Sequence, residues 1–352
     1  MESNQNISIT MDYKVLVGCM TYNHSKYIVD ALNGFAMQKT NFPFACIVMD
    51  DASTDGEPEV IKEWLQKECA MERANYYDLE LANVIFVPHK TNTNCTFAIY
   101  LLKRNLYKEE YLKFNLVKGL VGHGEYLALC DGDDYWTDIT KLQSQADCLD
   151  RHPHIDISIH SYVEIKADTY EFTQSYSNEE CIIPTDQIIL NIAFIPAAGS
   201  IFIRSKILKP IPNYILLFPT DYSLLLCGSS SSGASFLPNS MSVYRNNISN
   251  SLTKTIDKDI SICNDYIYRR IQALKIFDKE TNYSYHRIIQ SRILIDCATC
   301  INSPFFFIKN LITYWAGIKD VPRRFKISLF AKCIFPKAIQ VRIRNRKMTT
   351  SS

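Results

Sequence analysis

With 352 residues, of which 47% are hydrophobic and 21% charged, the chain can bury a sizeable core, and its composition excludes a disordered or fibrous protein. Its 38 basic and 37 acidic residues nearly cancel, so the net charge gives no reason to expect a nucleic acid partner.

Strand and helix patterns alternate along the first part of the chain. Short apolar, β-branched runs predict strands at 13–20, 44–49, 84–87 and 126–130. Apolar side chains at helical spacing predict helices at 26–38, 57–70 and 141–150, and we expect more helical material between the third and fourth strands. Later strands are predicted at 155–165, 198–203 and 241–245, with a loop at 229–232 and a helical pattern from about 260 onward.

This βαβα order predicts an α/β fold. We expect a mostly parallel mixed sheet flanked by helices, which receives ligands at the carboxyl ends of its strands. The predicted organisation is a flexible N-terminus at 1–12, a main α/β domain at 13–255 and a helical C-terminal region at 256–352.

Polar clusters follow three of the predicted strands, at 21–23, 50–51 and 131–134. Because the carboxyl ends of parallel strands meet at one edge of a sheet, we expect these clusters to converge. A carboxylate at 50–51 could accept a hydrogen bond from a nucleobase. The Ser, Thr and Asp residues that follow would equally serve as helix caps.

The third cluster offers the carboxylates of Asp131, Asp133 and Asp134. Hard divalent cations such as Mn²⁺ or Mg²⁺ take oxygen ligands from carboxylates and phosphates together, so a metal site for a diphosphate is one interpretation. A charged turn is the alternative, because Asp-Gly is a common turn pair.

The motifs together resemble a known family. The runs MTYN at 20–23, VMDDASTDG at 48–56 and GEYLALCDGDDYWTD at 124–138 resemble the bacterial family 2 glycosyltransferases, which are inverting enzymes with the GT-A fold. The similarity continues through 141–145, 219–222 and 241–245, and covers about 13–245. It implies a GT-A-type (Rossmann-like) catalytic domain, a nucleotide-sugar donor, UDP-linked by expectation, and Mn or Mg as the divalent cation. The implied acceptor is a glycan or lipid-linked saccharide, in the assembly of a bacterial surface polysaccharide such as capsule or O-antigen.

The resemblance also implies roles for individual residues. Thr21, Tyr22 and Asn23 would line the nucleotide pocket, and Asp51 or Asp50 would contact the nucleobase. Asp131 and Asp133 would form the DxD element, with Asp133 as the more direct metal ligand and Asp134 beside it. Asp221 stands where the family places its catalytic base. One base and one metal suffice for an inverting transfer, because the cation neutralises the leaving diphosphate.

Alternatives stay open for several of these residues. Asp221 would also suit the N-terminus of a helix. Tyr244 and Arg245 could face the diphosphate, or Arg245 could pair with a surface carboxylate. Trp136 could stack on a sugar face, or it could simply be buried packing.

The segment 91–118 departs from the family pattern. It lacks the expected Asn-Gly turn, and Arg104 with Asn105 is only a weak match to the family's Arg-Asn pair. This segment is interpreted as an insertion that could shape the donor or acceptor pocket.

Four histidines lack metal-like spacing and are expected to make local hydrogen bonds: His24, His89, His123 and His160.

The C-terminal region is basic. From Arg323 to Lys347 there are nine Lys or Arg residues and no Asp or Glu, interleaved with apolar residues. Such a tail could lie on an anionic inner leaflet or pack as an amphipathic helix on the catalytic domain, and Pro336 should break any single helix.

No secretory signal is visible, and Lys309 and Asn310 interrupt the longest apolar stretch, 304–318. We therefore expect a cytoplasmic protein that can lie on the inner face of the membrane without crossing it.

The twelve cysteines are irregularly spaced and are expected to be reduced and buried. Cys297 and Cys300 form one tight pair, but no second pair completes a zinc site.

Two rival functions remain: a metal-dependent sugar nucleotidyltransferase, and a catalytically silent glycan-binding or scaffold protein of the same fold. The loop after Met20 has no Gly-rich basic sequence, which argues against the nucleotidyltransferase.

Overall fold

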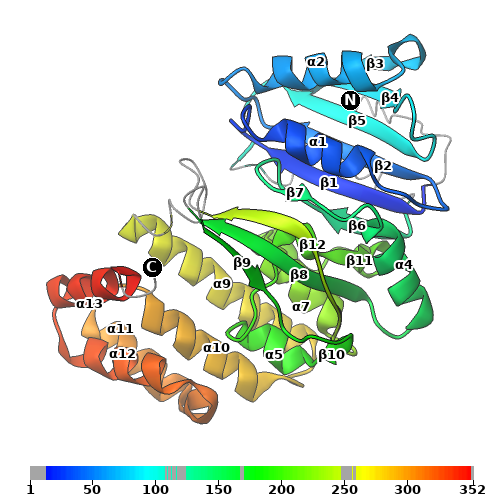
Figure 1. The fold of residues 1–352 in the computed structure, drawn as a ribbon. Coiled ribbons are helices and arrows are strands. Elements are labelled where there is room, and N and C mark those ends of the chain that lie inside the picture. Colours follow the sequence, from blue (N-terminus) through cyan, green and yellow to red (C-terminus); the bar gives the residue numbers. More distant parts are fainter. Residues whose placement is uncertain are drawn as a thin grey trace, which may run out of the picture. The chain divides into compact units, whose positions relative to one another are not determined.

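The computed structural model describes residues 13–107, 109, 112, 116, 124–166, 170–246, 256 and 259–349. The chain divides into two compact units, each described here by itself (Figure 1). The first unit comprises Met1–Pro184, Ala193–Ile211 and Cys227–Asn246. The second comprises Thr185–Ile192, Pro212–Leu226 and Asn247–Ser352. Two short segments that the sequence placed in the main domain therefore belong to the second unit.

A single mixed sheet runs through the first unit. Its strands are β1 (Val15–Thr21), β2 (Phe44–Asp50), β3 (Asn75–Asp78), β4 (Ala82–Pro88), β5 (Cys95–Leu102), β6 (Tyr126–Leu129), β7 (Tyr135–Trp136), β8 (Ile157–Lys166), β9 (Tyr170–Gln174), β10 (Cys181–Ile183), β11 (Phe202–Arg204) and β12 (Ala234–Asn246). Among the described residues their order is β10-β12-β8-β11-β6-β1-β2-β5-β4-β3, with β7 paired to β12 and β9 to β8. The expected α/β fold with a mixed sheet flanked by helices is confirmed, but the sheet is not mostly parallel. Of its eleven strand pairings among the described residues, four are parallel and seven are antiparallel.

The centre of the sheet is parallel. Strands β6, β1, β2 and β5 run in the same direction, and the register places Thr21 beside Asp50 at their carboxyl ends. The outer strands β4 and β11 are antiparallel to this centre. The polar residues that follow β1, β2 and β6 therefore emerge at one edge of the sheet.

Helices α1 (Ile28–Ala36), α2 (Glu57–Glu68) and α4 (Lys141–Arg151) cover one face of this centre. Alternate side chains of each central strand point to opposite faces, and both faces are buried: Val15 and Val17 pack with these helices, whereas Leu16 packs in a separate cluster on the other side. Buried faces on both sides explain why these strands are continuous apolar runs.

One central strand was not predicted. The sequence analysis expected helical material between the third and fourth strands, but Cys95–Leu102 forms β5, parallel to β2 and antiparallel to β4. For this stretch the expectation was wrong, because a short and almost fully buried apolar run has no period that separates a strand from a buried helix. Leu112 and Leu116, later in the same interval, are helical as expected. In the rest of the 91–118 segment, residues 108, 110–111, 113–115 and 117–118 lie outside the described residues.

The other predicted elements agree with the structure to within a few residues. The strands predicted at 84–87 and 241–245 belong to the longer β4 and β12, and 198–203 divides into a 3-10 turn (Ala198–Ser200) and β11. The short strands β3, β7, β9 and β10 were not predicted; none has enough alternating apolar residues to be recognised.

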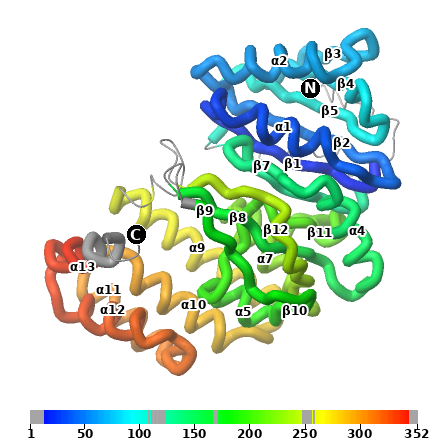
Figure 2. The backbone as a smooth tube through the Cα atoms, in the orientation of Figure 1, coloured from blue at the N-terminus to red at the C-terminus, as the bar shows by residue number. Residues whose placement is uncertain are grey.

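The second unit is helical. Its helices are α5 (Thr185–Leu190), α6 (Asn213–Leu217), the first part of α7 (Asp221–Ser229), α9 (Ile260–Glu280), α10 (His286–Thr299), α11 (Pro304–Thr313), α12 (Arg323–Ile334) and α13 (Lys337–Thr349). In Figure 2, α11 to α13 form the orange and red end of the tube. As expected, Pro336 separates two helices in the basic tail.

A buried ion cluster organises this unit. Asp296 in α10 accepts hydrogen bonds from Arg270 Nε at 2.9 Å and from Arg292 Nη2 at 2.7 Å. Arg292 Nη1 also donates to the carbonyl of Leu190 at 2.6 Å. This contact fixes α5 against α10, which explains why the Thr185–Ile192 segment belongs to the helical unit.

The apolar stretch 304–318 is interrupted, because α11 ends at Thr313 and a 3-10 turn (Trp315–Asp320) follows. In the part of the chain that the structure describes, none of the helices combines the length and the hydropathy that crossing a bilayer requires. All twelve cysteines are free thiols.

Candidate active site

Three loops meet at the carboxyl ends of the central strands. The Gly132 N–H donates to the carbonyl of Met20 at 2.9 Å, and the Asp51 N–H donates to the carbonyl of Thr21, also at 2.9 Å. These backbone bonds join the loops after β6 and β2 to the end of β1. The structure thus brings together the three polar clusters that the sequence placed at strand ends.

The approach of the first and third loops requires a glycine. A Cβ atom on Gly132 would lie 2.2 Å from Thr21 Oγ1 and 2.5 Å from Thr21 Cβ, both well inside van der Waals contact. Gly132 therefore lets the carboxylates on either side of it sit directly beside the end of β1.

The carboxylates of Asp131, Asp133 and Asp134 form a compact cluster. An oxygen atom from each lies within 4.8 Å of the others. Asp131 is exposed, Asp133 is half-buried and Asp134 is buried. Burial, and then the negative charges of Asp133 and Asp131, raise the pKa of Asp134 well above its usual value. Three close carboxylate oxygens are a donor set that fits a hard divalent cation, and Asp131 and Asp133 are the two ligands that solvent can reach.

Arg245, at the end of β12, fixes this cluster. Its backbone N–H donates to Asp134 Oδ1 at 2.8 Å, and its Nη1 donates to the carbonyl of Asp133, also at 2.8 Å. Its Nη2 pairs with Asp30 Oδ2 at 2.5 Å, and the guanidinium lies 4.4 Å from the centre of the Tyr135 ring. Of the two interpretations of Arg245, the ion pair with a surface carboxylate therefore describes this structure.

Glu57 is the residue that sequence reasoning missed. It is fully buried, its Oε1 accepts a hydrogen bond from Thr21 Oγ1, and its Oε2 accepts from His24 N at 2.8 Å and from Ser53 Oγ at 2.9 Å. One carboxylate thus joins the loop after β1 to the loop after β2. Its signal in the sequence is weak, because Glu in the first turn of a helix is common.

His24 lies between this network and the carboxylate cluster. Its Nδ1 is 3.2 Å from Thr21 Oγ1, and its Nε2 is 3.7 Å from Asp133 Oδ2. The Thr21 side chain is 3% exposed, so the structure gives it a supporting position under the expected pocket. Tyr22 is exposed in the same loop. Asn23 has a positive φ of 58° and accepts from Thr54 N at 2.8 Å.

Asp50 is the last residue of β2 and Asp51 follows it, and both are buried. Asp50 Oδ1 accepts from Ser53 N at 3.1 Å, and burial raises the pKa of this carboxyl group. Its Oδ2 is buried and has no hydrogen-bond partner among the residues that the structure describes. Asp51 Oδ1 accepts from Leu106 N at 2.6 Å, and its carbonyl accepts from Asn105 Nδ2 at 3.0 Å.

Three predicted site residues lie elsewhere or face another way. Arg104 is exposed and pairs with Glu109. Trp136 is 1% exposed, donates from Nε1 to Gly199 O at 3.1 Å and packs against Phe35, so the sugar-platform interpretation is wrong for this structure and the packing alternative holds.

Tyr244 precedes Arg245 on β12. Successive strand side chains point to opposite faces, so the two cannot both face one diphosphate. Arg245 lies on the carboxylate side, and Tyr244 packs against Tyr162 with ring centroids 6.2 Å apart.

Asp221 belongs to the second unit. It is the first residue of α7, its side chain is exposed, and its Oδ1 accepts from the N–H of Tyr222 at 2.7 Å. The Thr220 hydroxyl, which accepts from Ser223 N at 3.4 Å, occupies the capping position. The helix terminus therefore does not depend on Asp221 as its cap.

Comparisons with known proteins find similarity over part of the chain. Residues 17–82 match the model of the family described as Glycosyl transferase family 2. Uncharacterized proteins of Mycobacterium tuberculosis (Rv1520) and Mycobacterium bovis (Mb1547) are 32% identical to this chain over 229 residues, which cover 64% of this chain and 57% of each relative. The chain thus spans less than two thirds of the length of the curated relatives that it matches.

Solved structures are similar at lower identity. The crystal structure of S. aureus TarS 1-349 in complex with UDP-GlcNAc is 17% identical and has a TM-score of 0.49, with 81% of this chain and 80% of that chain covered. The mannosyltransferase PcManGT from Pyrobaculum calidifontis in complex with GDP-Man and Mn²⁺ is 14% identical, with a TM-score of 0.45 and coverage of 93% and 88%.

Proposed function

We propose that this chain moves a sugar, with inversion, from a nucleotide-sugar donor to a glycan or lipid-linked saccharide, and we expect the donor to be UDP-linked. The match of residues 17–82 to the model of glycosyl transferase family 2 supports this proposal. The observation that carries the proposal is the cluster of Asp131, Asp133 and Asp134 at the end of β6, directly beside the ends of β1 and β2. Assembly of a bacterial surface polysaccharide is the proposed setting.

The donor nucleotide would bind over the ends of β1 and β2. The buried Asp50 Oδ2, which lacks a hydrogen-bond partner in the described part of the chain, is an acceptor that a nucleobase N–H could satisfy. Asp51 next to it is held by the backbone of Leu106, so the edge of the pocket is fixed before the donor arrives. The exposed ring of Tyr22 is available to cover the base.

The donor diphosphate would bind beside the carboxylate cluster. Asp131 and Asp133 would hold Mn²⁺ or Mg²⁺, which, when bound, neutralises the negative charge of the leaving nucleoside diphosphate. Asp134 and Arg245 orient the loop that carries these ligands, because the Arg245 backbone and guanidinium both bond to it. His24 and Glu57 hold the facing loop in place.

Asp221 is proposed as the base. The acceptor hydroxyl oxygen attacks the anomeric carbon from the face opposite the diphosphate, and the bond from that carbon to the diphosphate oxygen breaks with its electron pair. Asp221 takes the hydroxyl proton. Its carboxylate is exposed at the start of α7, and desolvation raises the pKa of this carboxyl group above its usual value, which suits a group that takes up a proton.

A panel of labelled nucleotide sugars, UDP-linked and GDP-linked, offered with Mn²⁺ and a saccharide acceptor tests the proposal. We expect transfer of the sugar to the acceptor with inverted anomeric configuration, read by NMR. Asp133→Asn should lose metal-dependent donor binding, whereas Asp147→Asn, an exposed carboxylate on α4, should not. Joining of a sugar phosphate to a nucleoside triphosphate would instead identify a nucleotidyltransferase, and donor binding without any turnover would identify a silent scaffold.

A second pair of variants tests the base. Asp221→Asn should bind the donor normally but transfer no sugar, because the amide cannot accept the proton. Asp259→Asn is the matched control, since Asp259 caps α9 through its side chain and Asn is an equally good cap. Normal turnover in Asp221→Asn would remove this residue from the mechanism.

We also propose contact with an anionic membrane surface through α11 and α12. Apolar side chains at i, i+3 and i+7 are exposed on each helix: Phe305, Ile308 and Ile312 on α11, and Ile327, Phe330 and Ile334 on α12. Basic residues accompany them, and each cation near an anionic surface contributes about 1 kcal/mol. Lys332 is an exception, since it is buried and caps α10 through the carbonyl of Ala298 at 2.9 Å.

A further inference from the structure

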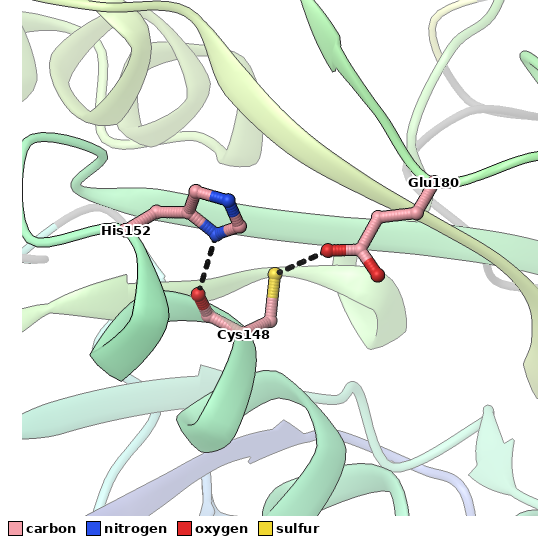
Figure 3. A group of neighbouring side chains, drawn as sticks. All are labelled: Cys148, His152 and Glu180. Atoms are coloured by element: carbon pink, nitrogen blue, oxygen red, sulfur yellow. Dashed lines mark hydrogen bonds between the residues drawn. The ribbon is translucent and has the colours of Figure 1, made fainter.

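A second group of metal-ligating side chains lies at the end of α4. Cys148 lies in the last turn of α4, His152 is the residue directly after the helix, and Glu180 comes from the segment directly before β10 (Figure 3). All three belong to the first unit. They differ from the carboxylates at the strand ends both in position and in chemistry, because they offer sulfur, nitrogen and oxygen.

The separation of the sulfur and carboxylate atoms matches a tetrahedral metal. The Cys148 Sγ is 3.7 Å from Glu180 Oε1, and the ligand atoms of the three residues all lie within 4.8 Å of one another. Zinc bonds of about 2.3 Å to sulfur and about 2.1 Å to oxygen at the tetrahedral angle place the two ligand atoms about 3.6 Å apart. The sulfur and the carboxylate therefore already stand at the separation that a shared zinc ion would impose.

A hydrogen bond defines the tautomer of His152. Its Nδ1 lies 2.9 Å from the carbonyl of Cys148, and a carbonyl oxygen can only accept, so Nδ1 carries the proton. That tautomer leaves Nε2 with its lone pair for a metal. The ring of His154 has its centre 6.2 Å from that of His152, which makes His154 a nearby source of a fourth ligand.

Burial decreases from the sulfur outward. Cys148 is fully buried, His152 is half-buried and Glu180 is exposed, so an ion can enter from the carboxylate side. Burial raises the pKa of the Cys148 thiol, which lies 2.9 Å from Ser235 Oγ. The metal-free cysteine is therefore a neutral thiol, and metal binding must release its proton. Arg151 pairs with Glu180 at 3.2 Å and is the partner that the metal would replace.

We propose that Cys148, His152 and Glu180 form a zinc site that fastens the end of α4 to the segment entering the edge strand β10. His154 or a water molecule completes the four ligands. This site is independent of the transfer reaction, because none of its residues takes part in the donor or metal site described above.

Zn²⁺ titration of the full-length, chelator-treated protein against a chromophoric competitor tests the site. All variants carry Asp131→Asn and Asp133→Asn, so that the carboxylates at the strand ends do not contribute. We expect one zinc ion per chain, with its affinity reduced at least about tenfold by Cys148→Ser and by His152→Gln. Cys333→Ser, a half-buried cysteine outside the cluster, is the matched control and should bind as the parent does.

Cobalt gives a readout that does not depend on stability. Co²⁺ bound at this site should show a thiolate-to-metal charge-transfer band that Cys148→Ser abolishes and Cys333→Ser keeps. Because buried Cys148 could be needed for folding, His152→Gln, at a half-buried position, serves as the second variant. Equal zinc affinity in His152→Gln and Cys333→Ser, or a cobalt spectrum without the thiolate band, would overturn the proposal and leave the glycosyltransferase assignment untouched.

Discussion

Gly132 and Glu57 carry no chemistry in the proposed transfer, yet they determine where the reactive carboxylates lie. Gly132 lets the loop after β6 touch Thr21, and Glu57 holds Thr21, His24 and Ser53 in one network. The cluster of Asp131, Asp133 and Asp134 is therefore set by atoms on three different strand ends.

Gly132→Ala should disturb this arrangement. The added Cβ would meet Thr21 Oγ1 at 2.2 Å, and relieving such overpacking costs about 1–3 kcal/mol. We expect Mn²⁺-dependent nucleotide affinity to fall at least tenfold while the protein stays folded, as measured by calorimetric titration and circular dichroism. Gly199→Ala is the control, because its Cβ would lie 3.4 Å from Ser242 in ordinary contact. Equal affinities in the two variants would contradict the role of Gly132.

Lys141 is a buried cation at the start of α4. Its Nζ donates to Gln145 Oε1 at 2.7 Å and lies 4.1 Å from the centre of the Trp136 ring. Burial lowers its pKa from 10.5 to about 7. The cation–π contact and one hydrogen bond thus replace only part of the hydration that this ammonium loses.

The free energy of unfolding should consequently rise with pH between about 7 and 10.5. In that window the unfolded chain holds a proton on Lys141 that the folded chain does not, which gives a slope of about 1.4 kcal/mol per pH unit. Below about pH 7 both states are protonated and this contribution is constant. Urea unfolding of Lys141→Met should lack this part of the slope, whereas a variant of the exposed Lys67 should keep it. Parallel pH profiles for wild type and Lys141→Met would refute the lowered pKa.

Single residues were predicted unevenly from the sequence. The aspartates at strand ends could be recognised, because a motif and a position after a strand both identify them. Glu57, Trp136 and Tyr244 could not, since their roles depend on which way a side chain points and on what packs against it. Neither property has a signature in the local sequence.

At the level of elements, the sequence predicted those with a clear period or clear ends. α1, α2 and α4 have apolar stripes, and β1, β2 and β6 end in polar turns. β5 was missed because all but one of its residues are buried, so its pattern lacks the alternation that identifies a strand. The assignment of α5 and α6 to the helical unit depends on distant contacts such as Arg292 with Leu190.

Asp296 makes α10 the organising helix of the second unit. Asp296→Ala would leave the half-buried Arg270 and the buried Arg292 without their carboxylate, and the loss of one partner of a buried ion pair typically costs about 3–5 kcal/mol. We expect the urea midpoint of the helical unit to fall correspondingly, monitored by far-ultraviolet circular dichroism. Asp265→Ala, an exposed carboxylate on α9, should change the midpoint little. A loss below about 1 kcal/mol for Asp296→Ala would show that the two arginines find other partners.

For the whole molecule, the residues of the proposed donor site belong to the first unit. The proposed base Asp221 and the proposed membrane-binding helices α11 and α12 belong to the second unit. The sequence placed the boundary near residue 255, but Thr185–Ile192 and Pro212–Leu226 belong with the C-terminal helices. A boundary of this kind is not contiguous in sequence, so neither composition nor linker signals can predict it.

Membrane association is tested at this scale. Ile327→Ser combined with Ile334→Ser should reduce co-sedimentation with phosphatidylglycerol vesicles at least tenfold, since each large apolar side chain contributes about 1.5–3 kcal/mol when it leaves water. Deletion of α12 is a poorer test, because it would also remove the buried Leu329 and Lys332. Tyr76→Ser, an exposed ring on β3, is the control, and neutral phosphatidylcholine vesicles should bind every variant weakly. Unchanged sedimentation of the double variant would end the membrane proposal.

The hydrogen bond from Arg245 to Asp134 joins positions that are 111 residues apart. A nascent polypeptide released from the ribosome before β12 would therefore contain every acidic residue of the cluster but not the strand that locks them. Such a fragment should be unable to capture a charged sugar donor, so competence would be acquired late in translation, once the last strand of the sheet has been made.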